Sequence, residues 1–172
     1  MPTEPTLPQK SLPHLRYVKV LIVDDDKRIA KLVKSVLNGL GFLSVHVEHS
    51  ALEALQYMAK EEVDLIICDW VMEKMDGVQM VQKLRKDLTN PNQLVPIIML
   101  SGNSEKPHIE KARDSGVTEY VMKPFTAKSL CSRIITVIEN PRSFIISDSF
   151  TGHNRRRKVR EYTGGDRRKP KK

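Results

Sequence analysis

Residues 20–26 read VLIVDDD, four aliphatic residues followed without a break by three aspartates. Val and Ile favour β-strands, and a run that is apolar throughout is typical of a parallel strand covered on both faces. Similar short runs recur along the chain. We predict strands at residues 17–23, 44–48, 64–68, 97–100 and 118–122.

The segments between these runs have the spacing of amphipathic helices. In residues 29–40, aliphatic side chains recur at the i, i+3, i+4, i+7 spacing, and Gly41 is placed to end the helix in a left-handed conformation. The same pattern predicts helices at residues 50–59, 77–88, 107–115 and 127–139. Five strands alternating with five helices predict an α/β fold, a doubly wound parallel sheet with helices on both faces.

The length and charge of the chain indicate one domain with extensions. We expect a flexible, proline-rich lead-in at residues 1–16, a domain at 17–140 and a basic tail at 141–172. Of the formal net charge of +8, residues 1–150 contribute none, with 19 Lys+Arg and 19 Asp+Glu, while residues 151–172 carry 10 and 2. This distribution excludes a uniformly basic domain that coats nucleic acid and predicts a neutral body with a cationic tail.

The cysteines and the hydropathy of the chain indicate its compartment. Cys68 and Cys131 fall in a predicted buried strand and a predicted helix, a setting typical of reduced thiols, so we expect no disulfide. No apolar run approaches the roughly 18 to 20 residues of a membrane span, and the first ten residues lack the apolar block of a secretory signal. We expect a soluble, cytoplasmic protein.

Polar side chains stand where the predicted strands end, at the rim where open α/β sheets bind ligands. They are Asp24, Asp25, Asp26, Asp69, Ser101 and Lys123. Crowded carboxylates repel one another unless a cation joins them, and an all-oxygen pocket suits octahedral Mg²⁺. A lysine opposite the metal would add positive charge beside an incoming phosphoryl group. The set therefore predicts a phosphoryl-transfer site with an aspartate as nucleophile, because no Cys or Ser with a neighbouring His stands on this rim.

Several nearby residues have simpler explanations. Asp26 is interpreted as the N-cap of the following helix. His46, His49 and His108 have no metal-ligand spacing and are interpreted as surface or rim residues. Trp70 is expected at the rim of the site.

Four motifs resemble the receiver domain of response regulators in two-component signalling. They are VLIVDDD at 20–26, DLIICDWVMEKMDG at 64–77, PIIMLSG at 96–102 and YVMKPF at 120–125. The resemblance extends over roughly residues 17–139 and implies a flavodoxin-like fold with strand order 2-1-3-4-5. It also implies a phosphorylation-activated switch of the stand-alone, single-domain type.

The resemblance assigns a role to each matching residue. Asp69 is implied as the phosphoacceptor, with Asp24, Asp25, Asp69 and the backbone carbonyl of Val71 holding Mg²⁺. Lys123 and Ser101 would contact the phosphoryl oxygens, and Tyr120 would be the aromatic residue that moves with Ser101. The implied chemistry is limited to Mg²⁺-dependent self-phosphorylation from a phosphodonor and self-dephosphorylation. The implied partners are a sensor histidine kinase or histidine phosphotransfer protein and a downstream protein.

Two positions depart from the family pattern. Glu73 occupies a position that is commonly proline, which predicts a less constrained and more acidic loop near the metal. Gly102 stands where alanine is common and predicts a wider opening at the phosphate.

The basic tail contains a repeat with a period of twelve. FTGHNRRR at 150–157 matches YTGGDRRK at 162–169. We interpret the repeat as a duplicated recognition element in preference to a solubilising disordered tail, with a turn at the glycine presenting the arginines. Its candidate residues are Phe150, Arg155, Arg156, Tyr162, Arg167 and Arg168.

The sequence leaves two functional hypotheses open. The first is a phosphorylation switch whose output is protein binding. The second is a nucleic-acid or anionic-surface binder that acts through the Arg-rich tail and is regulated by the receiver. A flavin- or nucleotide-binding enzyme is disfavoured because the first strand ends in acids where a phosphate-binding, glycine-rich loop would be needed.

Overall fold

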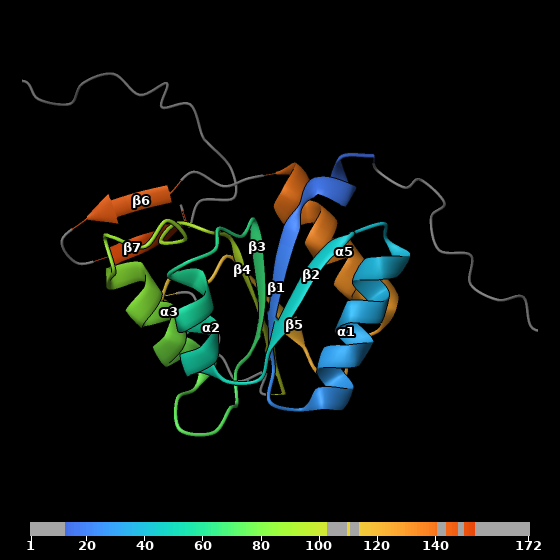
Figure 1. Cartoon of the computed structure of the whole chain (residues 1–172), viewed down its shortest axis with the longest axis horizontal. Helices are drawn as coiled ribbons and strands as arrows, with labels where there is room; N and C mark the ends of the chain where they lie inside the picture. Colours follow the sequence, from blue (N-terminus) through green and yellow to red (C-terminus); the bar gives the residue numbers. More distant parts are fainter. Residues whose placement is uncertain (1–12, 103–109, 111–113, 141–143, 148–149, 154–172) are drawn as a thin grey trace, which may run out of the picture.

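A computed structural model describes residues 13–102, 110, 114–140, 144–147 and 150–153 of the protein. Its centre is a five-stranded parallel sheet in the order β2-β1-β3-β4-β5 (Figure 1). The strands are β1 Lys19–Val23, β2 Ser44–Glu48, β3 Leu65–Asp69, β4 Ile97–Ser101 and β5 Glu119–Met122. The predicted fold class and strand order are confirmed.

Helices cover both faces of this sheet (Figure 1). On one face lie α1 Lys27–Gly39 and α5 Ala127–Glu139, and on the other lie α2 Ala51–Met58 and α3 Gly77–Lys86. Gly41 has φ 97° just after α1, as predicted for the end of that helix. The helix predicted at residues 107–115 falls largely outside the described residues. No helix in the described ranges has the length and apolar character needed to cross a membrane.

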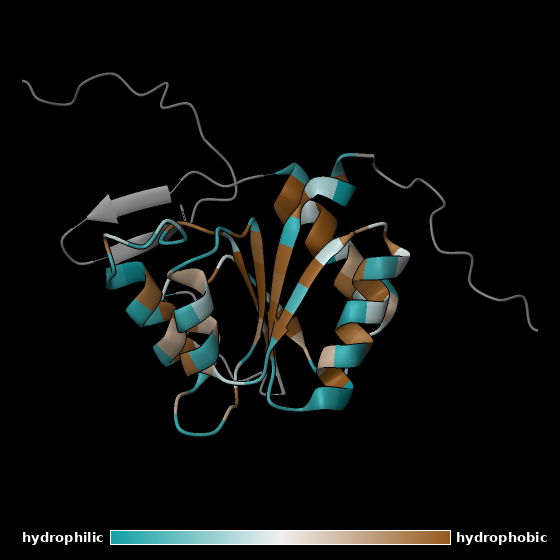
Figure 2. Cartoon of the chain, in the orientation of Figure 1, coloured by the Kyte–Doolittle hydropathy of each residue, from teal (hydrophilic) through white to brown (hydrophobic). Residues whose placement is uncertain are grey.

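The sheet separates two apolar clusters because successive side chains of a strand point to opposite faces. In β1, Leu21 and Val23 belong to the cluster under α2 and α3, whereas Val20 and Ile22 belong to the cluster under α1 and α5. The other central strands alternate in the same way, and Figure 2 shows the resulting hydrophobic centre between helices with polar outer faces. Burial on both faces explains why these strands are apolar runs in the sequence.

The first strand begins two residues later than the predicted start at residue 17. Residues Pro13–Tyr17 form a short 3-10 helix, and its Leu15 is buried in the cluster with α1 and α5. The folded core therefore extends into the segment that the sequence predicted as a flexible lead-in.

Buried polar side chains hold the connection between α3 and β4. Arg85, in the last turn of α3, is 3% exposed, and burial lowers its pKa to about 9. Its guanidinium donates to the main-chain carbonyls of Gln93, Val95 and Gly116. Asn92 is 2% exposed and donates to the carbonyls of Met58 and Glu61 at the end of α2. These hydrogen bonds join the connection between α3 and β4 to the end of α2 and to the segment before β5.

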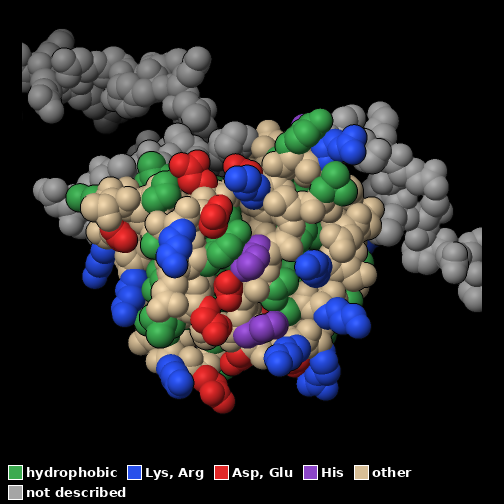
Figure 3. Space-filling view, in the orientation of Figure 1, with side chains coloured by type: hydrophobic (Ala, Val, Ile, Leu, Met, Phe, Trp, Pro, Cys, Tyr) green, Lys and Arg blue, Asp and Glu red, His purple; other side chains and the backbone are tan. Residues whose placement is uncertain are grey.

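A second, two-stranded sheet follows α5. Strands β6 Phe144–Ser147 and β7 Phe150–His153 are antiparallel, and β7 lies beside α3 (Figure 1). Gly152 pairs with Ile145 inside this ladder, so the turn predicted at this glycine is wrong. On the visible face, charges of both signs are interspersed (Figure 3), as expected for the neutral body.

Candidate functional site

The polar residues of the predicted site meet at the carboxyl ends of neighbouring strands. Asp24 follows β1, Asp69 ends β3, Ser101 ends β4 and Lys123 follows β5. Because β1, β3, β4 and β5 are adjacent and parallel, their ends deliver these residues to one edge of the sheet. Residues far apart in the chain are thereby brought together as predicted.

Three carboxylates form a compact acidic cluster. Asp24, Asp25 and Asp69 each offer an oxygen within 4.8 Å of the others. Asp24 is fully buried and Asp69 is 7% exposed, whereas Asp25 is exposed. The cluster therefore has a buried floor and one side open to solvent.

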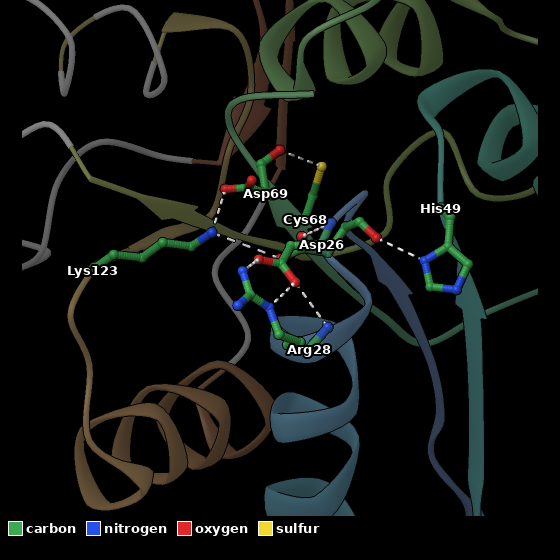
Figure 4. Close-up of polar contacts among 7 residues, drawn as sticks. Asp26, Arg28, His49, Cys68, Asp69 and Lys123 are labelled. Carbon is green, nitrogen blue, oxygen red and sulfur yellow. Dashed lines mark hydrogen bonds and ion pairs between the residues drawn. The ribbon is translucent and has the colours of Figure 1, made fainter. Parts of the chain in front are cut away.

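Lys123 supplies positive charge to the buried side of this cluster (Figure 4). Its Nζ lies 2.9 Å from Asp69 Oδ1 and 3.7 Å from Asp24 Oδ2. Its main-chain amide donates to the carbonyl of Ser101 at 2.6 Å, which ties the end of β5 to the end of β4. Among the described residues, one ammonium faces three carboxylates, which gives this cluster an excess of negative charge.

Burial of Asp24 disfavours its ionised form. Burial, reinforced by the charge of Asp69, raises its pKa to about 6, although Lys123 acts in the opposite direction. Asp24 Oδ1 accepts from the amide of Asp26 at 2.9 Å, but Oδ2 is buried and has no hydrogen-bond partner among the described residues. A buried carboxylate oxygen without a donor is costly unless a proton or a cation reaches it.

These observations fit a small divalent cation. Carboxylate oxygens are the ligands that Mg²⁺ prefers, and a cation would offset the repulsion within the cluster. Val71, whose backbone carbonyl the receiver resemblance adds to the metal site, lies in the loop just after β3, and its side chain is 72% exposed. Because Asp25 is exposed to solvent, a ligand could reach the cluster from that side.

The main chain of the loop between β3 and α3 holds one of these carboxylates. The amide of Glu73 donates to Asp25 Oδ2 at 3.1 Å, a bond that a proline at this position could not make. The loop was predicted to be less constrained because it lacks the proline, yet this bond restrains it. The contact was missed because a main-chain donor leaves no residue-type signal beyond the absence of proline.

Gly77, the first residue of α3, lets this helix approach strand β3 closely. A Cβ on Gly77 would come within 3.0 Å of Cys68 Sγ and even nearer to the carbonyl oxygen of Asp69. Cys68 is itself fully buried and free, and burial raises the pKa of its thiol well above the usual value. The close packing of α3 beside Asp69 thus depends on a glycine whose role was not predicted from the sequence.

Ser101 and Tyr120 occupy the two strands beyond Asp69. Ser101 is 2% exposed and Tyr120 is half-buried. The ring of Tyr120 meets that of Trp70 edge to face, with centroids 6.4 Å apart. Trp70 is only 5% exposed, so its predicted place at the rim is wrong: the residue after Asp69 turns into the cluster under α2 and α3. By contrast, a Cβ on Gly102 would meet nothing within 4 Å, so the space there would admit alanine.

Asp26 and His49 act on the main chain around the site (Figure 4). Asp26 is the N-cap of α1 and accepts from the amide of Arg28, as predicted. His49 is exposed, and its Nδ1 lies 2.9 Å from the carbonyl oxygen of Asp24. Because a carbonyl oxygen only accepts, Nδ1 carries the proton in this bond. His49 therefore supports Asp24 from the rim. His108 lies outside the described residues.

The tail residues are largely beyond the structure. Phe150 begins β7, whereas the five arginine and tyrosine candidates lie outside the described residues. The recognition role of the repeat therefore stays a prediction.

The fold and the site are those of a signalling receiver. Residues 20–135 match the family described as response regulator receiver domain, and the chain belongs to this family. Chemotaxis protein CheY-3 of Vibrio cholerae is 31% identical over 122 residues, which cover 71% of this chain and 92% of that protein. Chemotaxis protein CheY1 of Helicobacter pylori is 32% identical over 122 residues, which cover 70% of this chain and 97% of that protein.

Solved structures agree with this assignment. A Francisella response regulator receiver domain superposes with a TM-score of 0.65 at 31% identity, covering 71% of this chain and 97% of that chain. Vibrio cholerae chemotaxis protein CheY4 gives a TM-score of 0.64 at 29% identity, covering 70% and 98%. The likeness covers the receiver portion of the chain.

Proposed function

We propose that the protein is a phosphorylation switch that accepts a phosphoryl group on Asp69 from a histidine kinase or a histidine phosphotransfer protein. The ion pair between Lys123 Nζ and Asp69 Oδ1 at 2.9 Å, set beside two further carboxylates, carries this proposal. Membership of the receiver family supports it.

In the proposed transfer, a carboxylate oxygen of Asp69 attacks the phosphorus of a phosphohistidine. The new O–P bond forms as the N–P bond breaks, and the imidazole leaves with the electron pair and takes up a proton. Lys123 stays beside the phosphoryl group and offsets its negative charge. The acyl phosphate is later hydrolysed by water, which returns Asp69 to its carboxylate.

Asp24, Asp25, Asp69 and the carbonyl of Val71 would hold Mg²⁺ in this reaction. The cation would neutralise charge on the phosphoryl oxygens and allow an anionic donor to approach an acidic site. The chain's own contribution is to keep these oxygens in place, through the Asp26 amide on Asp24 and the Glu73 amide on Asp25.

The proposed output is a change of surface read by a downstream protein. Ser101 would hydrogen-bond the phosphoryl group, and Tyr120 on the neighbouring strand would change position with it. Because the ring of Tyr120 contacts that of Trp70, such a movement would alter packing next to Asp69.

Phosphorylation is tested with the purified chain and acetyl phosphate, with Mg²⁺ or with a chelator. We expect a mass increase of one phosphoryl group only with Mg²⁺, and none in Asp69→Asn. Glu62→Gln, an exposed carboxylate-to-amide change away from the site, is the matched control and should be labelled like the parent. Labelling of Asp69→Asn equal to that of the parent would refute the proposal.

A further inference from the structure

The exposed side of α3 and the loop before it form a positively charged groove. The groove has a volume of about 330 Å³, and its lining within the described ranges is Lys74, Met75, Gln79, Gln82, Lys83 and Lys86. Figure 3 shows Lys and Arg side chains along the left margin of the molecule, where Figure 1 places α3. We call this surface the α3 groove.

The three lysines of the α3 groove have no partner among the described residues. Lys74, Lys83 and Lys86 are exposed, and none takes part in an ion pair or side-chain hydrogen bond there. Lys83 and Lys86 lie in the last turn of α3, where positive charge favours the helix dipole. The helix dipole can therefore account for the positive charges of Lys83 and Lys86, but not for that of Lys74.

Lys74 lies in the loop before α3, two residues ahead of the N-cap Asp76, so the helix dipole gives no reason for a positive charge there. Its backbone has φ 65°, a left-handed conformation that residues with a side chain seldom adopt. This conformation closes a tight turn, in which the amide of Met75 donates to the carbonyl of Glu73, and the exposed side chain of Lys74 lines the groove.

The chain leaves the described structure on the same side of the molecule. Its last described residue is His153 at the end of β7, beside α3, and Arg155, Arg156 and Arg157 follow within four positions. The tail cannot neutralise the lysines, because residues 151–172 carry 10 Lys+Arg against 2 Asp+Glu. The described lining of the α3 groove contains no carboxylate, so an external anion could pair with its lysines.

We infer that the α3 groove is a docking site for an acidic segment of a partner protein. Carboxylates of the segment would pair with the lysines, Gln79 and Gln82 would hydrogen-bond its main chain, and Met75 would offer an apolar contact. The described lining contains neither an arginine nor an aromatic ring for stacking bases, which favours a peptide over a nucleic acid. This binding does not require phosphorylation of Asp69.

The test measures binding of a fluorescent acidic peptide, three repeats of Glu-Glu-Leu-Asp, to the full chain at about 0.15 M salt. The groove variant is Lys74→Gln, Lys83→Gln, Lys86→Gln. The control variant, Lys31→Gln, Lys34→Gln, Lys128→Gln, removes the same charge from exposed positions on α1 and α5. A thymidine twelve-mer is the nucleic-acid probe, and circular dichroism melting checks that both variants fold.

We expect the groove variant to bind the peptide about tenfold more weakly than the parent, from three exposed ion pairs, and the control variant to bind like the parent. In amide NMR spectra of the parent, the peptide should shift residues 74, 79 and 82. Equal losses in the two variants, or shifts confined to residues beyond 153, would overturn the inference. Tighter, lysine-dependent binding of the thymidine twelve-mer would overturn it in favour of a nucleic-acid surface.

Discussion

The buried carboxylate of Asp24 lowers the stability of the metal-free protein. Its folded pKa of about 6 lies above the ordinary value of 3.8, so the folded state binds this proton more tightly than the unfolded state. Proton binding to Asp24 therefore stabilises the folded state fully below about pH 4, and this stabilisation is lost as the pH rises through about 6. Asp24→Asn should therefore raise the free energy of unfolding at pH 7 by about 1–3 kcal/mol, measured by urea denaturation without Mg²⁺.

The pKa of Asp87 is shifted in the opposite direction to that of Asp24. Hydrogen bonds from Thr89 hold the pKa of this exposed carboxyl below its usual value. Asp87→Asn should therefore lower stability at neutral pH, where Asp24→Asn raises it. An Asp24→Asn protein no more stable than the parent at pH 7 would show that burial does not penalise this carboxylate.

The amide of Glu73 is predicted to organise the metal site. Glu73→Pro removes the donor to Asp25 Oδ2 and frees that carboxylate to leave the cluster. Loss of one hydrogen bond of about 1 kcal/mol should weaken Mg²⁺ binding roughly fivefold in isothermal titration calorimetry. Glu73→Gln keeps the amide and removes only the side-chain charge, so it should bind Mg²⁺ close to the parent. If Glu73→Gln loses as much affinity as Glu73→Pro, charge is responsible and the amide is not.

Residue types at strand ends predicted the cluster, but not the contacts that support it. Asp24, Asp69 and Lys123 could be placed together because parallel strands share one carboxyl edge. Burial of Trp70 could not be predicted, since it depends on how the chain turns after β3. The same holds for Arg85, which follows Leu84 in a helix and has no spacing that marks it as buried.

At the scale of elements, the contact of α3 with β3 depends on Gly77. Gly77→Ala would place a Cβ against the Asp69 carbonyl, which forces the start of α3 away from the strand. We expect a loss of about 1–3 kcal/mol in stability and a weaker affinity for Mg²⁺, measured by urea denaturation and calorimetry. Gly39→Ala is the control, because a Cβ there meets nothing within 4 Å. Equal effects of the two substitutions would rule out the steric explanation.

Periodicity predicted the central elements, and their limits were harder to place. Ser44–Glu48 agrees with the prediction because the alternating burial of this edge strand is clear in its sequence. The limits of β1 and the β6–β7 hairpin were missed for a different reason. A proline-containing 3-10 helix and a short two-stranded ladder are fixed by tertiary neighbours more than by their own residues.

At the scale of the molecule, the receiver and the cationic end should be separable. Removal of residues 154–172 leaves 19 Lys+Arg and 19 Asp+Glu, and both apolar clusters and the acidic site lie entirely before that point. The shortened chain should keep its melting temperature and Asp69 labelling. It should elute from a heparin column at much lower salt, because the excess positive charge is gone. A loss of labelling on truncation would show that the tail is part of the site.

The edge-to-face contact of Trp70 and Tyr120 also gives the protein an intrinsic fluorescence reporter. The chain has a single tryptophan, and this indole lies 6.4 Å from the ring that is proposed to move. Excitation energy absorbed by a tyrosine this near passes efficiently to the indole, and the transfer depends on the distance and mutual orientation of the two rings. A turn of Tyr120 would therefore change the tyrosine contribution to the indole excitation spectrum, and the state of the switch could be followed without any attached dye.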